Sequence, residues 1–222
     1  MSKFYLVATP IGNLSDVTLR ALDVLKSVNL IIAENPRTTR ILLQKYQITK
    51  NLLGFNEHSD EKTIDAIMER LKDGQDLALV SEAGTPAIAD PGGKLVARIL
   101  EKIGDQVNIV PIPGSSVLTA MLSVSGFNVN RFLFLGFLPK KKRRKTFLEI
   151  IKNSEFPVIV YESVYRVEKL LQELANLDIK EMVVGRELTK KFEAVYRGTP
   201  QEILEKLRSD KIKGEFVIVI NR

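Results

Sequence analysis

The residues best placed to do chemistry are carboxylates and arginines directly after two apolar runs. Glu34 follows the run 29–33 and precedes Arg37 and Arg40, and Glu82 follows the run 77–81. Open α/β sheets hold their ligands at the carboxyl ends of their strands, so these side chains are placed for a polar site. Glu34 or Glu82 would serve there as a general base, with Arg37 beside them. A structural ion pair between Glu34 and Arg37 explains the same residues equally well.

Three further loops follow predicted strands. Residues 81–93 hold five Gly or Pro in thirteen positions, which predicts a rigid loop that brings backbone N–H and C=O groups against a ligand. Residues 111–116 contain Ser115 and Ser116, whose hydroxyls would either cap the next helix or contact a ligand. Residues 9–14 taken alone read as a plain turn.

Several kinds of site are excluded by residue type. The chain has no Cys and one His, which excludes disulfides, thiol nucleophiles and zinc–thiolate sites, and no metal site is predicted. The single histidine, His58, is interpreted as a polar loop residue. No G-x-G-x-x-G follows the first strand, and Leu95 stands where a P-loop after Gly93 and Lys94 needs Ser or Thr.

Charge separates the two halves of the chain. The 222 residues are 45% hydrophobic and 27% charged, which is typical of a globular protein, and the net charge is +6. Residues 111–222 hold 20 Lys and Arg against 13 Asp and Glu. Six of these positive residues are consecutive and predict a polyanionic partner, although a solvated loop is the alternative: Lys140, Lys141, Lys142, Arg143, Arg144 and Lys145. With no apolar run of about 20 residues and no signal peptide, we expect a cytoplasmic protein without a membrane partner.

Hydrophobic periodicity predicts an α/β protein with two subdomains, 1–112 and 113–222. In the first, strands are expected at 4–8, 29–33, 77–81 and 107–110, and helices at 16–27, 38–46, 61–72 and 92–103. Residues 111–114 are expected to break both structures, because they contain two prolines and a glycine. In the second, strands are expected at 131–137, 158–161, 182–187, 193–197 and 216–220, and helices at 115–125, 145–152, 165–176 and 200–207. We expect a parallel sheet in the first subdomain and a mixed sheet in the second.

The ordered set of these motifs resembles the ribosomal RNA small-subunit methyltransferase I family, which has the tetrapyrrole-methylase fold. The resemblance runs through blocks 7–14, 33–40, 81–92, 111–116, 132–139, 161–163, 185–190 and 213–216. It implies a cytoplasmic homodimer that uses S-adenosylmethionine for 2′-O-methylation of a cytidine ribose in 16S ribosomal RNA. It also implies that the cofactor lies in a cleft between the two subdomains.

Carried over by position, the resemblance assigns roles to particular residues. The cofactor contacts are Pro10, Ile11, Ala83, Gly84, Thr85, Ile88, Ser115, Ser116, Tyr161, Arg186, Glu187 and Gly214. From their positions at strand ends and their charge, and not from the resemblance, Glu34, Arg37 and Glu82 are predicted to be catalytic, and RNA is expected to contact Arg40 and the positive residues from Lys140 to Lys145.

The sequence departs from the family pattern in several places. Asn35, Pro36 and Thr38 replace Asp, Thr and His, and Glu82 replaces Asp. Ala87 and Ala89 replace Gly and Ser, and the small C-terminal domain of many members is not expected here. Two alternatives therefore stay open. One is a methyltransferase of the same fold that acts on a small molecule such as a tetrapyrrole, or on a protein. The other is a noncatalytic RNA-binding module.

Overall fold

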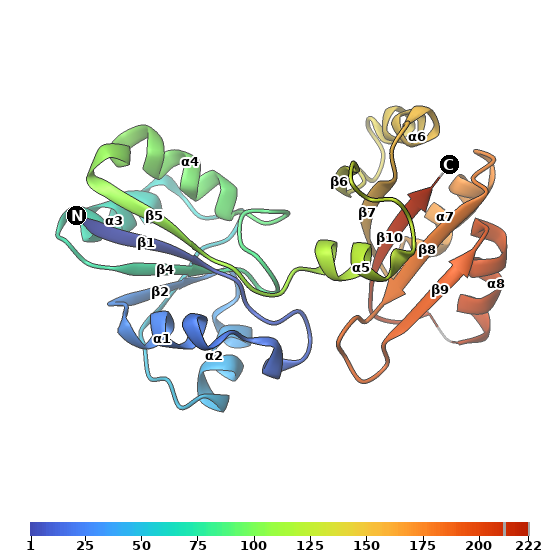
Figure 1. Cartoon of the computed structure of the whole chain (residues 1–222). Coiled ribbons are helices and arrows are strands. Elements are labelled where there is room, and N and C mark those ends of the chain that lie inside the picture. The colour runs from blue at the N-terminus through green and yellow to red at the C-terminus, as the bar shows by residue number, and fades with distance from the viewer. Residues whose placement is uncertain (211, 222) are drawn as a thin grey trace. The chain divides into compact units, whose positions relative to one another are not determined.

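The chain folds into two compact units, Met1–Ser116 and Val117–Arg222 (Figure 1). The computed structural model describes residues 1–210 and 212–221. The first unit ends four residues beyond the boundary expected from the sequence, because the turn after its last strand packs onto it. In that turn the Ser115 hydroxyl donates a hydrogen bond to the carbonyl of Asp16.

Unit 1, residues 1–116, is built on a five-stranded parallel sheet with the order β3-β2-β4-β1-β5. Its strands are β1 (Ser2–Val7), β2 (Leu30–Ala33), β3 (Leu52–Gly54), β4 (Leu77–Val80) and β5 (Val107–Ile112). Four of these strands match the sequence prediction. The short edge strand β3 was not predicted, because three residues carry too little periodicity.

Helices cover both faces of this sheet (Figure 1). One face packs against α1 (Leu19–Ser27) and α2 (Pro36–Lys45), and the other against α3 (Glu61–Lys72) and α4 (Gly92–Ile103). Side chains alternate between the faces, so that Leu77 and Leu79 lie on the α3/α4 side while Ala78 and Val80 lie on the α1/α2 side. Double coverage explains why β2 and β4 are continuous apolar runs.

Several predicted boundaries in unit 1 were wrong, and two of them have a clear physical reason. The predicted helix 16–27 is divided into a 3₁₀ turn, Leu14–Asp16, and α1, because the Thr18 side chain caps α1 by accepting a hydrogen bond from the N–H of Ala21. The predicted break at 111–114 begins too early, since β5 continues through Pro111 to Ile112 and pairs Leu6 with Pro111. Proline is tolerated there because β5 is an edge strand and needs no partner for that nitrogen.

Unit 2, residues 117–222, contains a mixed sheet with the order β6-β7-β10-β8-β9. Its strands are β6 (Leu133–Phe137), β7 (Val158–Ser163), β8 (Glu181–Arg186), β9 (Ala194–Gly198) and β10 (Glu215–Asn221). Strands β6 and β7 are parallel, and the other pairs are antiparallel. The predicted α/β class with two subdomains and a mixed second sheet is therefore confirmed.

One face of the unit 2 sheet packs against α6 (Arg144–Asn153), α7 (Val167–Ala175) and α8 (Pro200–Ser209), and the other against α5 (Val117–Ser125). Helix α5 starts two residues later than predicted.

A 3₁₀ turn, Gly104–Gln106, links α4 to β5 in unit 1. Among the described residues, no helix is both long enough and apolar enough to cross a bilayer.

Candidate active site

Three loops of unit 1 meet at Gly84. Strands β4, β1 and β5 are neighbours in a parallel sheet, so the loops 81–93, 9–14 and 111–116 leave the same edge. Thr9 and Gly84 form a bridge in which Thr9 N donates to Gly84 O at 2.9 Å and Gly84 N to Thr9 O at 3.0 Å. A Cβ at Gly84 would lie 3.3 Å from Ile11 Cγ2 and 3.6 Å from Ser115 O. The sheet thus gathers the three loops for which the sequence predicted ligand contacts.

Hydroxyl groups tie these loops together and leave one group unpaired. Thr85 Oγ1 donates to Ser115 O at 3.2 Å, and Ser115 Oγ donates to Asp16 O at 3.0 Å. The side chain of Thr9 is buried, and its Oγ1 has no hydrogen-bond partner. A buried hydroxyl without a partner is satisfied by a ligand or a water, so Thr9 marks a position where this edge can accept one.

The loop 81–93 is held rigid by Asp90. Its carboxylate accepts hydrogen bonds from Ala87 N at 3.0 and 2.9 Å and from Gly92 N at 2.7 Å. Gly92 is required, because a Cβ there would lie 2.8 Å from Asp90 Oδ1 and 2.9 Å from Leu79 Cδ2. Ala87 adopts a left-handed φ of 69°, where the family pattern has glycine. Ile88 is about half exposed and provides apolar surface beside the loop.

The two predicted carboxylates are neighbours. Glu34 Oε2 accepts a hydrogen bond from Glu82 N at 2.9 Å, and Glu82 Oε1 accepts from Asn35 Nδ2 at 3.0 Å and from Thr38 Oγ1 at 3.2 Å. Asn35 also caps α2, whose first residue is Pro36. Asn35 and Thr38, two of the departures from the family pattern, therefore bond to Glu82.

Burial raises the pKa of Glu34, and the nearby charges of Asp90, Glu82 and Glu57 raise it further. The hydrogen bond from Glu82 N lowers this pKa, but by less than the other effects raise it. Arg37 and Arg40 are exposed, and in the part of the chain that the structure describes no ion pair joins Glu34 to Arg37. The predicted structural pair between Glu34 and Arg37 is therefore not formed, and Glu34 is held instead by the N–H of Glu82.

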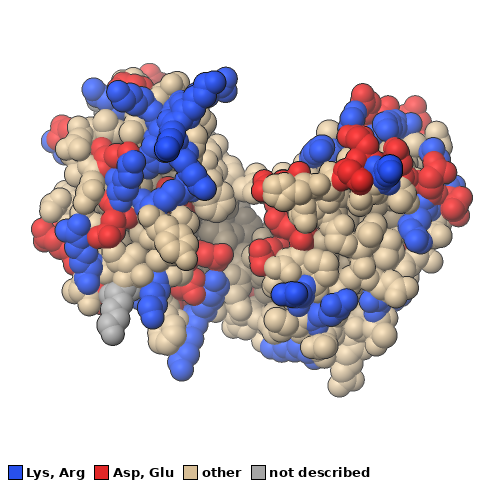
Figure 2. All heavy atoms as spheres, turned by 180° about the vertical axis from the view of Figure 1, so that it is seen from behind, with Lys and Arg blue, Asp and Glu red and all other residues tan. Residues whose placement is uncertain are grey.

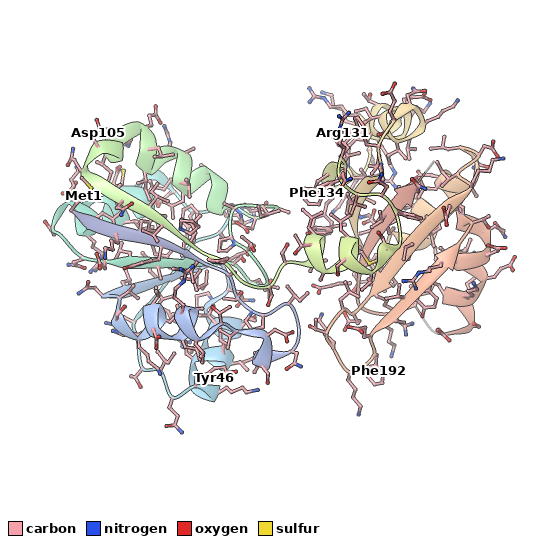
Figure 3. All side chains as sticks on the ribbon, viewed as in Figure 1. Met1, Tyr46, Asp105, Arg131, Phe134 and Phe192 are labelled. Atoms are coloured by element: carbon pink, nitrogen blue, oxygen red, sulfur yellow. The ribbon has the colours of Figure 1, made fainter. Side chains whose placement is uncertain are left out.

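In unit 2, Tyr161 lies on the α5 face of the sheet. Its ring makes edge-to-face contacts with Phe134 at 5.0 Å and Phe137 at 5.6 Å between ring centroids. Figure 3 labels Phe134 on β6. Burial raises the pKa of Tyr161 to about 12, and a hydrogen bond with the backbone of Leu118 acts in the opposite direction. Tyr161 is therefore neutral and can serve as a flat apolar contact.

Arg186 and Glu187 differ in how they are held. Nε and Nη1 of Arg186 are buried without a partner, and its guanidinium lies 5.6 Å from the ring centre of Tyr196. Glu187 Oε1 accepts from Glu215 N at 2.9 Å and from Lys190 Nζ at 3.0 Å. Burial alone would raise the pKa of Glu187, but these two hydrogen bonds bring it below its ordinary value.

Gly214 is needed for the packing of Glu187. A Cβ at Gly214 would collide with the carboxyl end of the Glu187 side chain. Gly214 also has φ of 89°, a conformation that favours glycine. The two residues that the family pattern pairs with the cofactor are thus in direct contact.

The run of positive residues is divided by burial. Lys140, Lys141, Lys142, Arg143 and Lys145 are exposed. Arg144 is buried, and its Nη2 lies 2.5 Å from Glu173 Oε2 while its Nη1 donates to Pro139 O at 3.1 Å. The side chain of Arg144 is therefore engaged in unit 2 and is not available for the predicted RNA contact. Figure 2 shows Lys and Arg gathered over one end of this unit.

Sequence reasoning missed a second arginine contact, this one to a buried carboxylate. Arg166 Nη2 lies 2.7 Å from Glu162 Oε1, and Arg166 Nη1 donates to Leu138 O at 2.9 Å. The i, i+4 spacing of Glu162 and Arg166 was the available signal, but it spans the end of β7 and the start of α7 instead of one helix. His58 lies in an exposed turn with Nε2 at 3.4 Å from Glu57 Oε1.

Comparison with known proteins places this chain in a family. Residues 3–204 match the family Tetrapyrrole (Corrin/Porphyrin) Methylases. The chain is 45% identical to Ribosomal RNA small subunit methyltransferase I of Leptospira biflexa, over 98% of this chain and 90% of that protein. It is 40% identical to the protein of that name from Thermotoga maritima, over 100% and 99% of the two chains. It is 43% identical to the protein of that name from Bacillus subtilis, over 99% of this chain and 75% of that protein.

The chain belongs to the ribosomal RNA small subunit methyltransferase I family. The predicted resemblance is confirmed, and members of the family are methyltransferases by name. Identities of 40–45% to these relatives do not favour the small-molecule, protein or noncatalytic alternatives.

Solved structures confirm the tetrapyrrole-methylase fold. Diphthine synthase superposes with a TM-score of 0.74 at 15% identity, over 99% of this chain and 90% of that one. Uroporphyrin-III C-methyl transferase from Thermus thermophilus, complexed with S-adenyl homocysteine, superposes with a TM-score of 0.67 at 14% identity, over 98% and 97%.

Proposed function

We propose that this member of the ribosomal RNA small subunit methyltransferase I family transfers a methyl group from S-adenosylmethionine to the 2′-oxygen of a cytidine in 16S ribosomal RNA. The observation that carries the proposal is the meeting of three strand-end loops at Gly84, beside the buried and unpartnered hydroxyl of Thr9. The relatives at 40–45% identity support the ribosomal RNA substrate by their name.

The residues of unit 1 fit the cofactor. Backbone groups and small or apolar side chains line this edge, which suits adenine and the methylene groups of the cofactor. We assign to it Pro10, Ile11, Ala83, Gly84, Thr85, Ile88, Ser115 and Ser116, and add Thr9. When bound, S-adenosylmethionine supplies a methyl group on a positively charged sulfur. For unit 2 taken by itself, we propose Tyr161, Arg186, Glu187 and Gly214 as cofactor contacts.

Glu34 is proposed as the base that takes the proton of the ribose hydroxyl. A ribose 2′-OH is a weak acid, so a positioned base contributes about 10²–10⁴-fold. The N–H of Glu82 holds Oε2 of Glu34, and we assign the proton to Oε1. Arg37 and Arg40 are exposed at the same strand end and are proposed to contact phosphate, as are the exposed residues Lys140, Lys141, Lys142, Arg143 and Lys145. A cytoplasmic homodimer acting on the small ribosomal subunit completes the proposal.

The test is transfer of labelled methyl from S-adenosylmethionine to small ribosomal subunits from cells that lack the activity. We expect label on one ribose 2′-oxygen. Glu34→Gln should lower kcat at least 100-fold and leave the cofactor dissociation constant unchanged by calorimetry. Glu101→Gln is the matched control, because Glu101 is exposed on α4, is not among the groups that shift the pKa of Glu34, and should leave both quantities unchanged. Cofactor binding without transfer to RNA would contradict the proposed substrate, and full activity of Glu34→Gln would contradict the base.

A further inference from the structure

Two aromatic side chains stand exposed at the base of the positive run. Tyr165 is 93% exposed in the turn between β7 and α7, and Phe137 is 54% exposed at the end of β6. Lys140 follows Phe137 by three residues. Large exposed aromatic surface beside a charged segment marks an interaction site, because water is a poor partner for it.

Both aromatic residues are fixed to the same scaffold. The ring of Phe137 packs edge-on against Tyr161 with 5.6 Å between centroids, and Phe137 pairs with Tyr161 across β6 and β7. Arg166, the neighbour of Tyr165, donates to the carbonyl of Leu138 at 2.9 Å. The turn that carries Tyr165 is therefore bonded to the residue that follows Phe137.

The exposed positive residues follow Leu138 and Pro139, and an arginine binds the backbone carbonyl of each of these two residues. Glu162, which is 1% exposed, holds Arg166 at 2.7 Å, so the contact with Leu138 rests on a buried carboxylate. Arg144 donates to the carbonyl of Pro139 at 3.1 Å and is held by Glu173. Two anchored arginines thus bind the consecutive carbonyls of residues 138 and 139, from which the exposed lysines lead away.

We propose that Tyr165 and Phe137 stack on unpaired nucleobases while Lys140, Lys141, Lys142 and Arg143 bind the phosphates of the same RNA strand. The chemistry selects single-stranded RNA, because the bases of a duplex are already stacked and present only their edges. Exposed rings beside cations match the features with which single strands are bound: stacking on each base and electrostatic attraction along the backbone. The inference rests on the proposed function and adds the form of RNA that unit 2 recognises.

Stacking and charge have different signatures in a binding experiment. Loss of a stacked base lowers affinity by roughly tenfold at every salt concentration. Loss of a phosphate contact lowers the slope of log affinity against log salt by about 0.7 per contact on a single strand. The two classes of side chain can therefore be told apart in one titration series.

The experiment measures binding of the full chain to an unstructured RNA oligonucleotide and to a duplex of the same sequence, by fluorescence anisotropy at several salt concentrations. Tyr165→Ala should weaken single-strand binding roughly tenfold with an unchanged salt slope, and Tyr165→Phe should restore it. Lys141→Ala combined with Lys142→Ala should lower the slope. Phe192→Ala is the matched control, since Phe192 is 68% exposed but lies in the β8–β9 loop, at the end of unit 2 away from α6 (Figure 3).

Tyr165 is exposed enough that its replacement does not disturb the fold, so a null result is informative. Unchanged single-strand affinity of Tyr165→Ala would overturn the inference, as would an equal loss on the duplex. A change in sedimentation of Tyr165→Ala would overturn it too, since the ring would then belong to a contact between copies of the chain. Failure of the proposed function would give a different result. If the wild-type protein bound the single strand but transferred no label to small subunits, the proposed function would be contradicted and the stacking inference would not.

Discussion

Arg144 should stabilise the fold of unit 2, although its neighbours in the sequence are exposed positive residues. Its guanidinium donates three hydrogen bonds to the carboxylate of Glu173, at 3.0, 2.9 and 2.5 Å, and one to Pro139 O at 3.1 Å. The side chains of Arg144 and Glu173 are 8% and 23% exposed. Replacing Arg144 with Ala leaves the Glu173 carboxylate without its partner.

The magnitude follows from the burial of the pair. Breaking a buried ion pair on one side costs about 3–5 kcal/mol, because the remaining charge stays desolvated. Glu173 keeps part of its hydration, so we expect Arg144→Ala to lower the free energy of unfolding of unit 2 by about 2–4 kcal/mol. Lys145→Ala, which removes an exposed charge in the same helix, should change it by less than about 0.5 kcal/mol.

The assay is urea unfolding followed by far-ultraviolet circular dichroism, since the chain has no Trp. Hydrogen exchange of the α7 amides assigns the loss to unit 2, because a chain of two units need not unfold in one step. The double variant Arg144→Met with Glu173→Leu should recover part of the loss, as it leaves no unpaired charge. Equal urea midpoints for Arg144→Ala and Lys145→Ala would refute the reasoning.

Three further predictions concern backbone strain and titration. Ala87→Gly should raise the free energy of unfolding of unit 1 by about 0.5–1 kcal/mol in urea titrations, because φ of 69° strains alanine; a lower midpoint would contradict this. Gly214→Ala should lower the free energy of unfolding of unit 2 by about 1–3 kcal/mol, since the Cβ of the new alanine would collide with Glu187. Lys213→Ala is the control. The pKa of Glu34 lies above 4.5, so wild-type stability should fall relative to Glu34→Gln as the pH rises from about 4.5 through the raised pKa. A difference between these two proteins that does not vary with pH would show that Glu34 is not desolvated.

The sequence predicted the strands well where both faces of the sheet are buried. The apolar runs of β2 and β4 are uninterrupted because helices cover both sides, and such runs are visible without coordinates. One of its errors came from a residue with two possible roles. Pro111 breaks a central strand but is accepted at an edge, and the sequence does not show that β5 is an edge.

The candidate site was predictable as a set of loops and not as a set of contacts. Strand ends located the loops 9–14, 81–93 and 111–116. The bridge between Thr9 and Gly84 joins residues 75 positions apart in the chain, so no local pattern indicates it. Arg144 was predicted to contact RNA together with its neighbours, because a run of positive residues does not show which side chain faces the interior. The structure shows that Arg144 is buried and paired with Glu173.

The position of β10 has a consequence for synthesis of the chain. β10 is the last strand, yet it is the central strand of the unit 2 sheet and pairs with both β7 and β8. Without it the sheet falls into two two-stranded pieces, β6 with β7 and β8 with β9, and such pieces are marginally stable in water. Unit 1 contains all of its strands by residue 112 and can complete its sheet on the ribosome. Unit 2 completes its sheet only after β10 has been synthesised, so a nascent chain halted before Glu215 would carry a finished first unit and an open second one.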